Sequence, residues 1–242
     1  MSEPVRLTLV GATGLVGTET IAAAVGAARY RLNAVTRREI DFPRGARMEA
    51  VLADPADWPA AIAATAPQAF ACALGTTWRQ SGKSEDAFRA VDERLVLESA
   101  RAARAAGATR AVVVSSIGAD RHSKNFYLRV KGEVEKALGE IGFERLDILR
   151  PGLLKGARGG DRRVMERLGI VASPLTNLLL HGKYRQYRAI PARMVAEAML
   201  QLAGETARGR QIHDNDGIRR EALRFRRKAA SPAIDRVGPH GQ

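Results

Sequence analysis

The stretch that decides the fold is VRLTLVGATGLVG, residues 5–17. Its first six residues are mostly branched and apolar, which predicts a buried strand, and a helix is expected over residues 15–28. Between them stand Gly11, Gly14 and Gly17, which provide a tight turn, room for the backbone to approach a pyrophosphate, and close packing of helix on strand. The start of a helix also offers free N–H groups and a positive dipole end to phosphates. The stretch therefore predicts dinucleotide binding, and a purely structural turn is the alternative.

The rest of the chain repeats this alternation of strand and helix. Near-continuously apolar runs predict further strands at residues 32–35, 48–54, 69–74, 111–116 and 145–151. Helical patterns fall between them, at residues 58–66, 84–107 and 125–138. Apolar strands that alternate with helices form a parallel sheet covered on both faces. We therefore predict an α/β protein with a doubly wound parallel sheet, the Rossmann fold.

After Pro151 the alternation becomes less regular. A loop rich in Gly and Arg precedes a predicted helix near residues 191–203 and a weaker strand pattern, RQIHD, at residues 210–214. We interpret this part as a small cap region at the carboxyl edge of the sheet, where doubly wound folds hold their ligands. The prediction is a single NAD(P)-binding domain over residues 1–216, with cap elements from about residue 152 to residue 216.

The positive charge is unevenly distributed. The net charge is +13, and residues 156–242 hold 17 basic and 8 acidic side chains, against 22 and 18 in residues 1–155. Such a basic end can bind an acidic partner, nucleic acid or a membrane surface. The simpler interpretation, which we favour, is that residues 217–242 form a flexible, solvated tail.

The end of the second predicted strand bears on the choice of dinucleotide. It reads VTRRE, residues 35–39, with Arg37 and Arg38 where an NAD-binding protein would place an acidic residue for the ribose hydroxyls. Guanidinium groups match a 2′-phosphate, so the sequence favours NADP(H) over NAD(H). The alternative is two solvated arginines in an Arg-rich chain.

Candidate catalytic residues follow the fifth predicted strand. Ser115 and Ser116 end that strand, and Tyr127 and Lys131 stand four residues apart in the next helix, so they share one of its faces. Lys131 can lower the pKa of the phenol and hold ribose hydroxyls, while a serine hydroxyl can bind the reacting oxygen. We favour Ser116 over Ser115, although a slip of one residue in the strand would reverse them. A Tyr and a Lys at this spacing can also be surface chemistry.

Four stretches carry a family resemblance: GATGLVG, CALGTTWRQSGKSEDAFRAVD, SSIGADRHSKNFYLRVKGEVE and LRPGLL. The sequence resembles the atypical short-chain dehydrogenases/reductases, and more narrowly the branch that contains the human Tat-interacting oxidoreductase-like protein and its bacterial relatives. Members of this branch include reductases and proteins with a regulatory binding role. The resemblance implies NADPH bound by residues of the glycine loop, the strand ends and the loops that follow them: Gly11, Thr13, Gly14, Leu15, Val16, Gly17, Arg37, Arg38, Asp54, Leu74, Gly75, Thr76, Ser115, Tyr127, Lys131, Pro151, Gly152 and Leu153.

One stretch is a false phosphate signal. SGKS, residues 81–84, resembles the end of a P-loop, but six residues separate Gly75 from Gly82 where that motif has four. We predict instead a helix N-terminus capped by Ser84. The side chains expected on the inward face of this helix are Phe88, Val91, Leu95 and Ala102.

Other classes of function are not favoured. The four histidines are scattered without ligand spacing, so we predict no metal site. Cys72, the one cysteine, is expected to be a small buried hydrophobe. With no leader pattern and no long apolar segment, the sequence predicts a cytoplasmic protein without a membrane span. We expect no specific nucleic-acid binding, and a monomer or a homodimer.

These observations predict an NADP(H)-dependent oxidoreductase that acts on a small carbonyl compound or alcohol. Ser116, Tyr127 and Lys131 are the catalytic candidates. The alternative is a catalytically quiet NADP(H)-binding regulator that presents its cap or tail to a protein partner.

Overall fold

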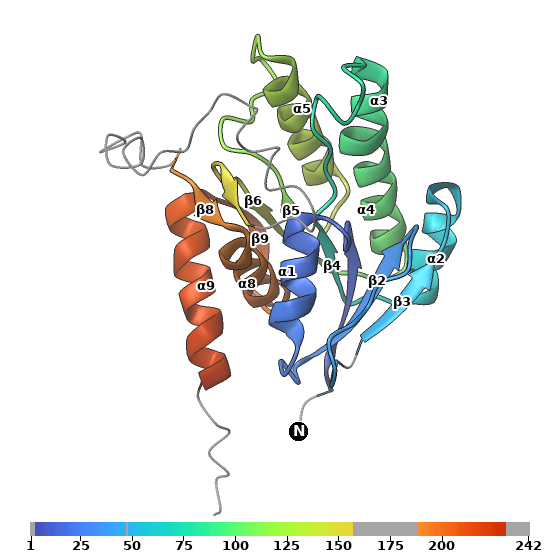
Figure 1. The fold of residues 1–242 in the computed structure, drawn as a ribbon, viewed down its shortest axis with the longest axis vertical. Coiled ribbons are helices and arrows are strands. Elements are labelled where there is room, and N and C mark those ends of the chain that lie inside the picture. Colours follow the sequence, from blue (N-terminus) through green and yellow to red (C-terminus); the bar gives the residue numbers. More distant parts are fainter. Residues whose placement is uncertain (1–2, 47, 157–187, 231–242) are drawn as a thin grey trace, which may run out of the picture.

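The fold is a parallel sheet with helices on both faces (Figure 1). The computed structural model describes residues 3–46, 48–156 and 188–230. Seven strands pair in the order β3-β2-β1-β4-β5-β6-β9, every pair parallel. The strands are β1 Val5–Val10, β2 Tyr30–Thr36, β3 Met48–Leu52, β4 Ala69–Cys72, β5 Arg110–Val114, β6 Arg145–Leu149 and β9 Gly209–His213. The predicted Rossmann fold is confirmed, and the order reverses between β1 and β4, which is where such folds bind dinucleotides.

The helices connect these strands and cover the sheet. They are α1 Leu15–Ala24, the 3₁₀ turn η1 Pro55–Asp57, α2 Trp58–Ala64, α3 Glu85–Arg89, the π-helical turn η2 Ala90–Leu95, α4 Val96–Ala105, α5 Phe126–Glu140, α8 Ala192–Ala203 and α9 Asn215–Ala230. A separate pair of short strands, β7 Leu154–Lys155 and β8 Ile190–Pro191, lies apart from the main sheet. No helix among the described residues is long and apolar enough to cross a membrane.

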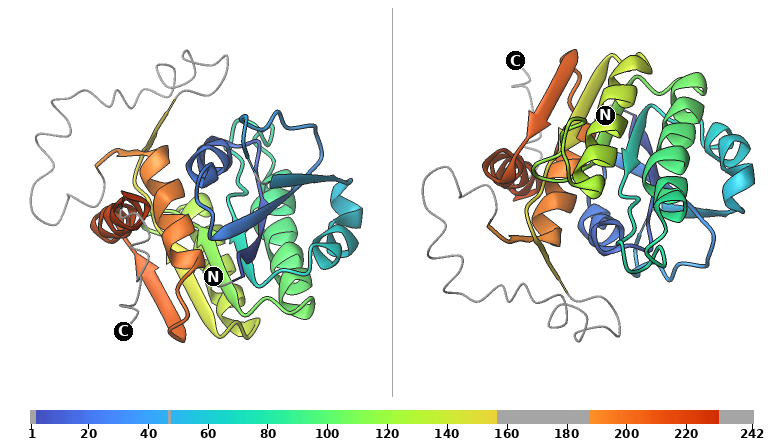
Figure 2. Two further views of the ribbon diagram at one scale, coloured as in Figure 1. Left: turned by 90° about the horizontal axis from the view of Figure 1, so that it is seen from below. Right: turned by 90° about the horizontal axis from the view of Figure 1, so that it is seen from above.

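Helices cover both faces of the sheet (Figure 2), and an apolar layer lies beneath them on each face. Leu7 and Leu9 of β1 point to the layer under α1 and α8, whereas Val10 points to the layer under α2, α4 and α5. Each fully buried side chain of this kind contributes roughly 1.5–3 kcal/mol relative to an exposed one. Because both faces are buried along most of β1, β2, β4, β5 and β6, these strands are largely apolar, which explains why they could be recognised in the sequence.

The predicted cap is wrong for the elements that the structure describes. α8 packs against α1 with Val195, Met199 and Leu202 buried, and β9 extends the main sheet beside β6 with Ile212 opposite Ile148. These elements therefore complete the sheet instead of covering its edge. The helix near residues 191–203 and the strand at residues 210–214 were predicted, but their place in the main sheet was not, because they stand far along the chain from β6. The rest of the predicted cap, residues 157–187, lies outside the described residues.

The predicted flexible tail is also wrong for residues 217–230. These residues belong to α9, which lies beside α8 (Figure 1) and buries Ile218, Ala222 and Phe225. The spacing of these three residues is that of one helix face. The many arginines between them masked this pattern in the sequence. Residues 231–242 lie outside the described part.

The long helix after the SGKS stretch begins as predicted. The Ser84 side chain caps α3 by accepting a hydrogen bond from the Ala87 N–H, at 3.2 Å. The predicted inward face holds at Phe88 but its centre shifts by one residue after it, because the π-helical turn η2 adds one residue to the helix turn. Leu95 and Ala102 remain half-buried against the apolar layer. Buried positions move from Val91 to Asp92 and from Leu95 to Val96, and Ala102 gives way to Ala103.

Candidate cofactor and catalytic site

The glycine loop fits a dinucleotide. Gly11 has a φ of +80°, which a residue with a side chain rarely adopts, and a Cβ there would overlap the backbone of Ala73. A Cβ on Gly17 would overlap the carbonyl oxygen of Gly11, so strand and helix could not approach so closely. Gly14 is the N-cap of α1 and provides no side-chain cap, so the first N–H groups of α1 are available to phosphate oxygens.

The ends of β2 and β3 lie together at the same edge of the sheet. The Ala53 N–H donates to the Thr36 carbonyl at 3.0 Å, which places Asp54 near the turn that begins at Arg37. Thr36 holds that turn through its hydroxyl, which donates to the Arg38 carbonyl at 3.0 Å. Arg37 and Arg38 are both exposed, so their guanidinium groups are accessible to an anionic group.

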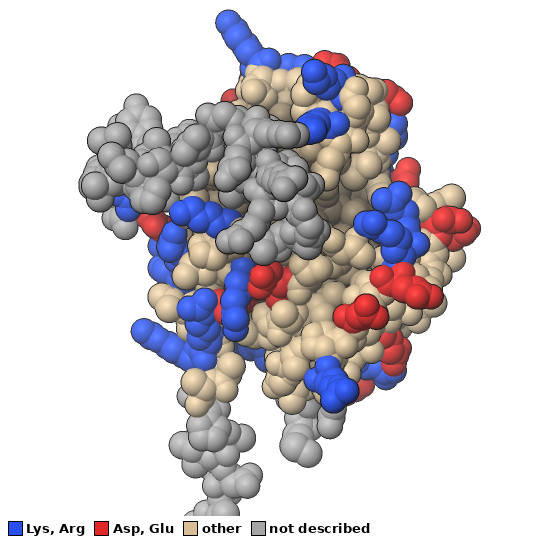
Figure 3. Space-filling view, viewed as in Figure 1, with Lys and Arg blue, Asp and Glu red and all other residues tan. Residues whose placement is uncertain are grey.

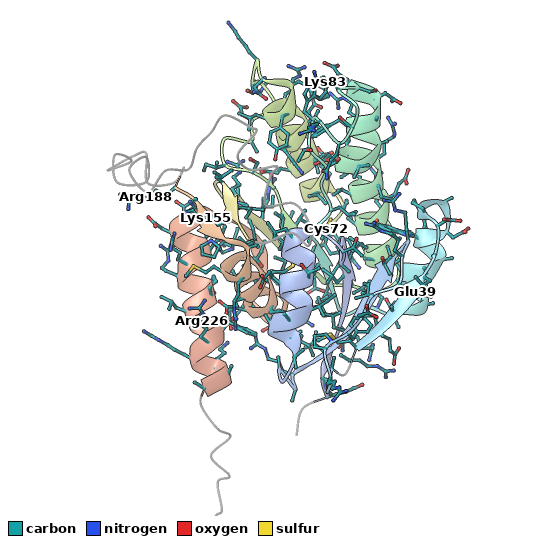
Figure 4. All side chains as sticks on the ribbon, viewed as in Figure 1. Glu39, Cys72, Lys83, Lys155, Arg188 and Arg226 are labelled. Carbon is teal, nitrogen blue, oxygen red and sulfur yellow. The ribbon has the colours of Figure 1, made fainter. Side chains whose placement is uncertain are left out.

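The loop of Leu74–Thr77 follows β4 directly. Its start is held to β1, because the Ala73 N–H donates to the Val10 carbonyl at 2.9 Å. Further along, the Thr76 N–H donates to Asp92 Oδ2 at 2.7 Å. Cys72 is buried at the end of β4 (Figure 4). Burial raises the pKa of the Cys72 thiol to about 12, which fits the predicted inert hydrophobe.

The two serines after β5 differ in their neighbours. Ser115 is buried, and its hydroxyl donates to Glu135 Oε1 of α5 at 2.6 Å. Ser116 is half-buried, and its hydroxyl contacts only the carbonyl of Ile117, at 3.3 Å, among the described residues. The Ser116 hydroxyl is thus the freer of the two.

Tyr127 and Lys131 lie on the face of α5 that meets the helix of residues 85–105. The half-buried Tyr127 ring packs edge-on against Phe88, with centroids 5.7 Å apart. The Lys131 side chain is only 7% exposed, and its Nζ lies 2.7 Å from Asp92 Oδ1. Burial alone would lower the pKa of Lys131, but Asp92 and, less strongly, Tyr127 outweigh it, so the pKa is raised and the amine stays charged.

The loop of Pro151–Leu153 after β6 is held from two sides. The Ile117 N–H donates to the Pro151 carbonyl at 3.0 Å, which joins this loop to the serine loop. The Gly152 N–H donates to Asn215 Oδ1, at the start of α9, at 2.9 Å. The packed helix α9 therefore supports one of the predicted cofactor loops.

The predicted site residues thus gather at the carboxyl ends of six neighbouring strands. The glycine loop follows β1, Arg37 and Arg38 follow β2, Asp54 follows β3, and the remaining loops follow β4, β5 and β6. Thr13, at the tip of the glycine loop, is exposed. Within the part of the chain that the structure describes, no group of three or more His, Cys, Asp or Glu side chains could hold a metal ion.

Three buried charged or polar partners of these residues were not predicted from the sequence: Asp92, Glu135 and Asn215. Glu135 accepts hydrogen bonds from Ser115 and from Arg150, whose Nε lies 2.9 Å from Oε1. Its position four residues after Lys131, on the same helix face, is a signal that could have identified it. No comparable pattern indicates Asp92, which only the π-helical turn brings inward.

Comparisons with known proteins agree with this architecture. A model of a protein family described as NAD(P)H-binding matches residues 11–205. The chain is 36% identical over 164 residues to "Protein fmp52, mitochondrial" of Emericella nidulans, which covers 65% of this chain and 70% of that protein. A protein of Bacillus halodurans described as an NAD-dependent epimerase/dehydratase has a TM-score of 0.66 at 22% identity, over 91% of this chain and 99% of that one. MoeE5 in complex with UDP-glucuronic acid and NAD has a TM-score of 0.65 at 17% identity, over 86% and 75%.

The relatives contradict the predicted cytoplasmic location. Similar proteins of Lodderomyces elongisporus and Scheffersomyces stipitis are, like that of Emericella nidulans, named as mitochondrial. The expectation of a cytoplasmic protein depends on the lack of a leader pattern and on a single cysteine, which does not distinguish one reducing compartment from another. The prediction is therefore wrong, and the relatives' names indicate mitochondria instead.

The family match covers most of the chain, and the solved structures share its overall fold. The chain belongs to the NAD(P)H-binding family and has a Rossmann fold.

Proposed function

We propose that the protein is an NADP(H)-dependent oxidoreductase that transfers a hydride to or from a small carbonyl compound or alcohol. The observation that carries this proposal is the position of Tyr127 and Lys131, one turn apart on α5 and next to the loop that begins at Ser116. This loop follows β5 at the same edge of the sheet as the glycine loop. Doubly wound folds hold their ligands at that edge.

Each of the three side chains has a role in this proposal. The Tyr127 phenol gives a proton to the reacting oxygen, or takes one from it. The Ser116 hydroxyl donates a hydrogen bond to the same oxygen, where negative charge develops. The Lys131 ammonium holds the ribose hydroxyls of the cofactor and provides a positive charge one helical turn from the phenol. Bound NADP(H) supplies or accepts the hydride.

The preference for NADP(H) is proposed from Arg37 and Arg38. Both are exposed beyond β2, and neither forms an ion pair within the described residues. A 2′-phosphate would give them a partner with matching charge and geometry. A nicotinamide cofactor as such is consistent with the family match and with the NAD-bound structures of similar fold.

One observation favours a second candidate function, a catalytically quiet NADP(H)-binding regulator. The charge of Lys131 is already paired with the buried carboxylate of Asp92. An ammonium that is paired with a carboxylate has less influence on the phenol of Tyr127, because the opposite charge offsets its own. In a regulator, the site would hold the cofactor without turnover.

The test is a substrate panel followed at the absorbance band of NADPH. Aldehydes, ketones and quinones are offered to the full chain with NADPH, and alcohols with NADP⁺, while binding of NADPH is measured separately by fluorescence. The oxidoreductase proposal expects turnover above background with at least one class. Tight NADPH binding without turnover on any of them would favour the regulator.

A further inference from the structure

The helix of residues 85–105 contains a π-helical turn in its middle. The turn η2 joins α3 to α4 without a break in the helix. Such turns are rare, and they are frequent at functional sites, because the wider turn re-aims the side chains that follow. Here the turn brings Asp92 into the core in place of Val91, so that a carboxylate lies where the apolar pattern would place a valine.

Asp92 joins three elements through its two oxygens. The residue is 1% exposed. Oδ2 accepts the Thr76 N–H from the loop after β4 at 2.7 Å, and Oδ1 lies 2.7 Å from Lys131 Nζ on α5. A single carboxylate therefore fixes the position of the Leu74–Thr77 loop relative to the ammonium. A shift of either group would weaken the contact of the other.

Stability alone does not account for this arrangement. Desolvation of two charges is costly, and a protein whose buried ion pair is replaced by apolar residues of similar volume is often no less stable. The pair also requires the π-helical turn η2, whose hydrogen bonds depart from the regular pattern. Lys131 lies near Tyr127, and Asp92 contacts a predicted cofactor loop. A fixed geometry of the pair would therefore position groups that are predicted to meet the cofactor.

We propose that Asp92 is a positioning residue, which holds the Lys131 ammonium and the Leu74–Thr77 loop in one arrangement and so couples cofactor binding to the placement of the charge beside Tyr127. This inference depends on the proposed function only for the role of Tyr127. The coupling between Asp92, Lys131 and cofactor binding can be measured without turnover.

The charge of Asp92 also keeps Lys131 protonated. The ionisable groups that act on Lys131 are Asp92 from η2, Tyr127 from α5 and Cys72 from β4. Cys72 is neutral at ordinary pH, because burial raises its pKa to about 12. Without the Asp92 carboxylate, burial would lower the pKa of Lys131 with little to oppose it. The amine would then hold its proton less tightly than in the unmutated protein.

Four variants separate these contributions. Asp92→Asn removes the charge but keeps an oxygen that can accept the Thr76 N–H, whereas Asp92→Leu removes both. The double variant Asp92→Asn/Lys131→Met buries no charge at this place, so it reports on folding. The matched control is Asp86→Asn, at the exposed start of the same helix, where the side chain is 85% exposed.

The affinity for NADPH is measured by fluorescence from pH 6 to pH 9, with melting temperatures recorded for each variant. For the unmutated protein and for Asp86→Asn, we expect the NADPH affinity to show no pH dependence that arises from Lys131. In Asp92→Asn, affinity should fall about tenfold and fall further as pH rises, because the amine becomes neutral. That added pH dependence should vanish in the double variant. Asp92→Leu should bind more weakly than Asp92→Asn, because the loop also loses its hydrogen bond.

Two results would overturn the inference. One is unchanged affinity and pH dependence in Asp92→Asn, and the other is a pH dependence that persists in the double variant. If the double variant melts normally, a folding defect does not explain the losses. If the coupling is found but no carbonyl compound is reduced, the role of Asp92 in cofactor binding stands and the oxidoreductase proposal fails. If Tyr127-dependent turnover is found but Asp92→Asn behaves as the unmutated protein, the oxidoreductase proposal stands and the proposed role of Asp92 fails.

Discussion

Ser115 and Ser116 are adjacent in the chain but have different surroundings, which leads to different expected effects of substitution. Ser116→Ala should lower turnover by about 10²-fold or more, the usual effect of losing a donor to a developing oxyanion, and should barely change the melting temperature. Ser115→Ala leaves Glu135 with one donor fewer in a buried place, so it should lower the free energy of unfolding by about 1–2 kcal/mol. Steady-state kinetics and thermal melts of both variants check this. A larger loss of turnover for Ser115→Ala than for Ser116→Ala would exchange their roles.

Arg37 and Arg38 should determine the choice between the two nicotinamide cofactors. Each charge-assisted hydrogen bond to a 2′-phosphate is worth about 1.5–3 kcal/mol, so the double Ala variant should lose most of the preference for NADPH over NADH. The control is Arg31→Ala on the same strand, where Arg31 is exposed and contacts Glu49 at 2.7 Å. Dissociation constants from titration provide the measurement. Equal values for the two cofactors in the unmutated protein would contradict the assignment.

Residues could be predicted from the sequence where local spacing determines their place. Tyr127 and Lys131 share a helix face at any α-helical geometry, and the glycines of the first loop have steric tasks that the structure bears out at Gly11 and Gly17. Asp92 could not be predicted, because its inward position depends on a π-helical turn that no spacing rule indicates. Asn215 contacts Gly152 across 63 residues of chain, a separation beyond any local pattern.

At the scale of elements, α9 is expected to be part of the folded core. Phe225 is 7% exposed against α8, whereas Leu223 on the same helix is 50% exposed. Phe225→Ala should therefore lower the free energy of unfolding by about 3–5 kcal/mol, and Leu223→Ala by much less. Chemical denaturation of the two variants measures the difference. Equal, small effects would mean that α9 does not pack on α8 in solution.

The position of α9 also determines what truncation of the chain should do to its stability. Asn215, at the start of α9, accepts the Gly152 N–H, and Arg226 pairs with the buried Glu197 at 2.7 Å. Removal of residues 219–242 leaves the Glu197 carboxylate without one of its partners and exposes an apolar face of α8, so the chain should be destabilised. Removal of residues 231–242 alone leaves these contacts in place. The elements before Pro151 and their order were predictable because strand and helix alternate at short intervals. The elements α8 and β9 were predicted as helix and strand but not as part of the main sheet, since they stand far along the chain from β6, and α9 was not predicted.

At the scale of the whole molecule, the excess of positive charge is partly paired. Lys and Arg side chains gather over α9 (Figure 3), but Arg224 and Lys228 contact Glu205, and Arg226 contacts Glu197. This pairing favours a docked, solvated helix over a nucleic-acid surface. Any binding of random duplex DNA should be weak and should fall steeply with salt, because it would depend on counterion release. Fluorescence anisotropy at 50 and 200 mM salt is the check, and tight, salt-insensitive binding would contradict the expectation.

The helix that carries Tyr127 follows β5, at the edge of the sheet that the glycine loop also occupies, and the central claim is that Tyr127 is the proton donor of an NADPH-dependent reduction. The most direct measurement is turnover, at the NADPH absorbance band, together with NADPH affinity, for the unmutated protein and Tyr127→Phe. The substitution removes one oxygen and keeps the ring against Phe88. We expect turnover to fall by about 10² to 10⁴ while affinity and melting temperature change little. Turnover that survives Tyr127→Phe intact would contradict the claim.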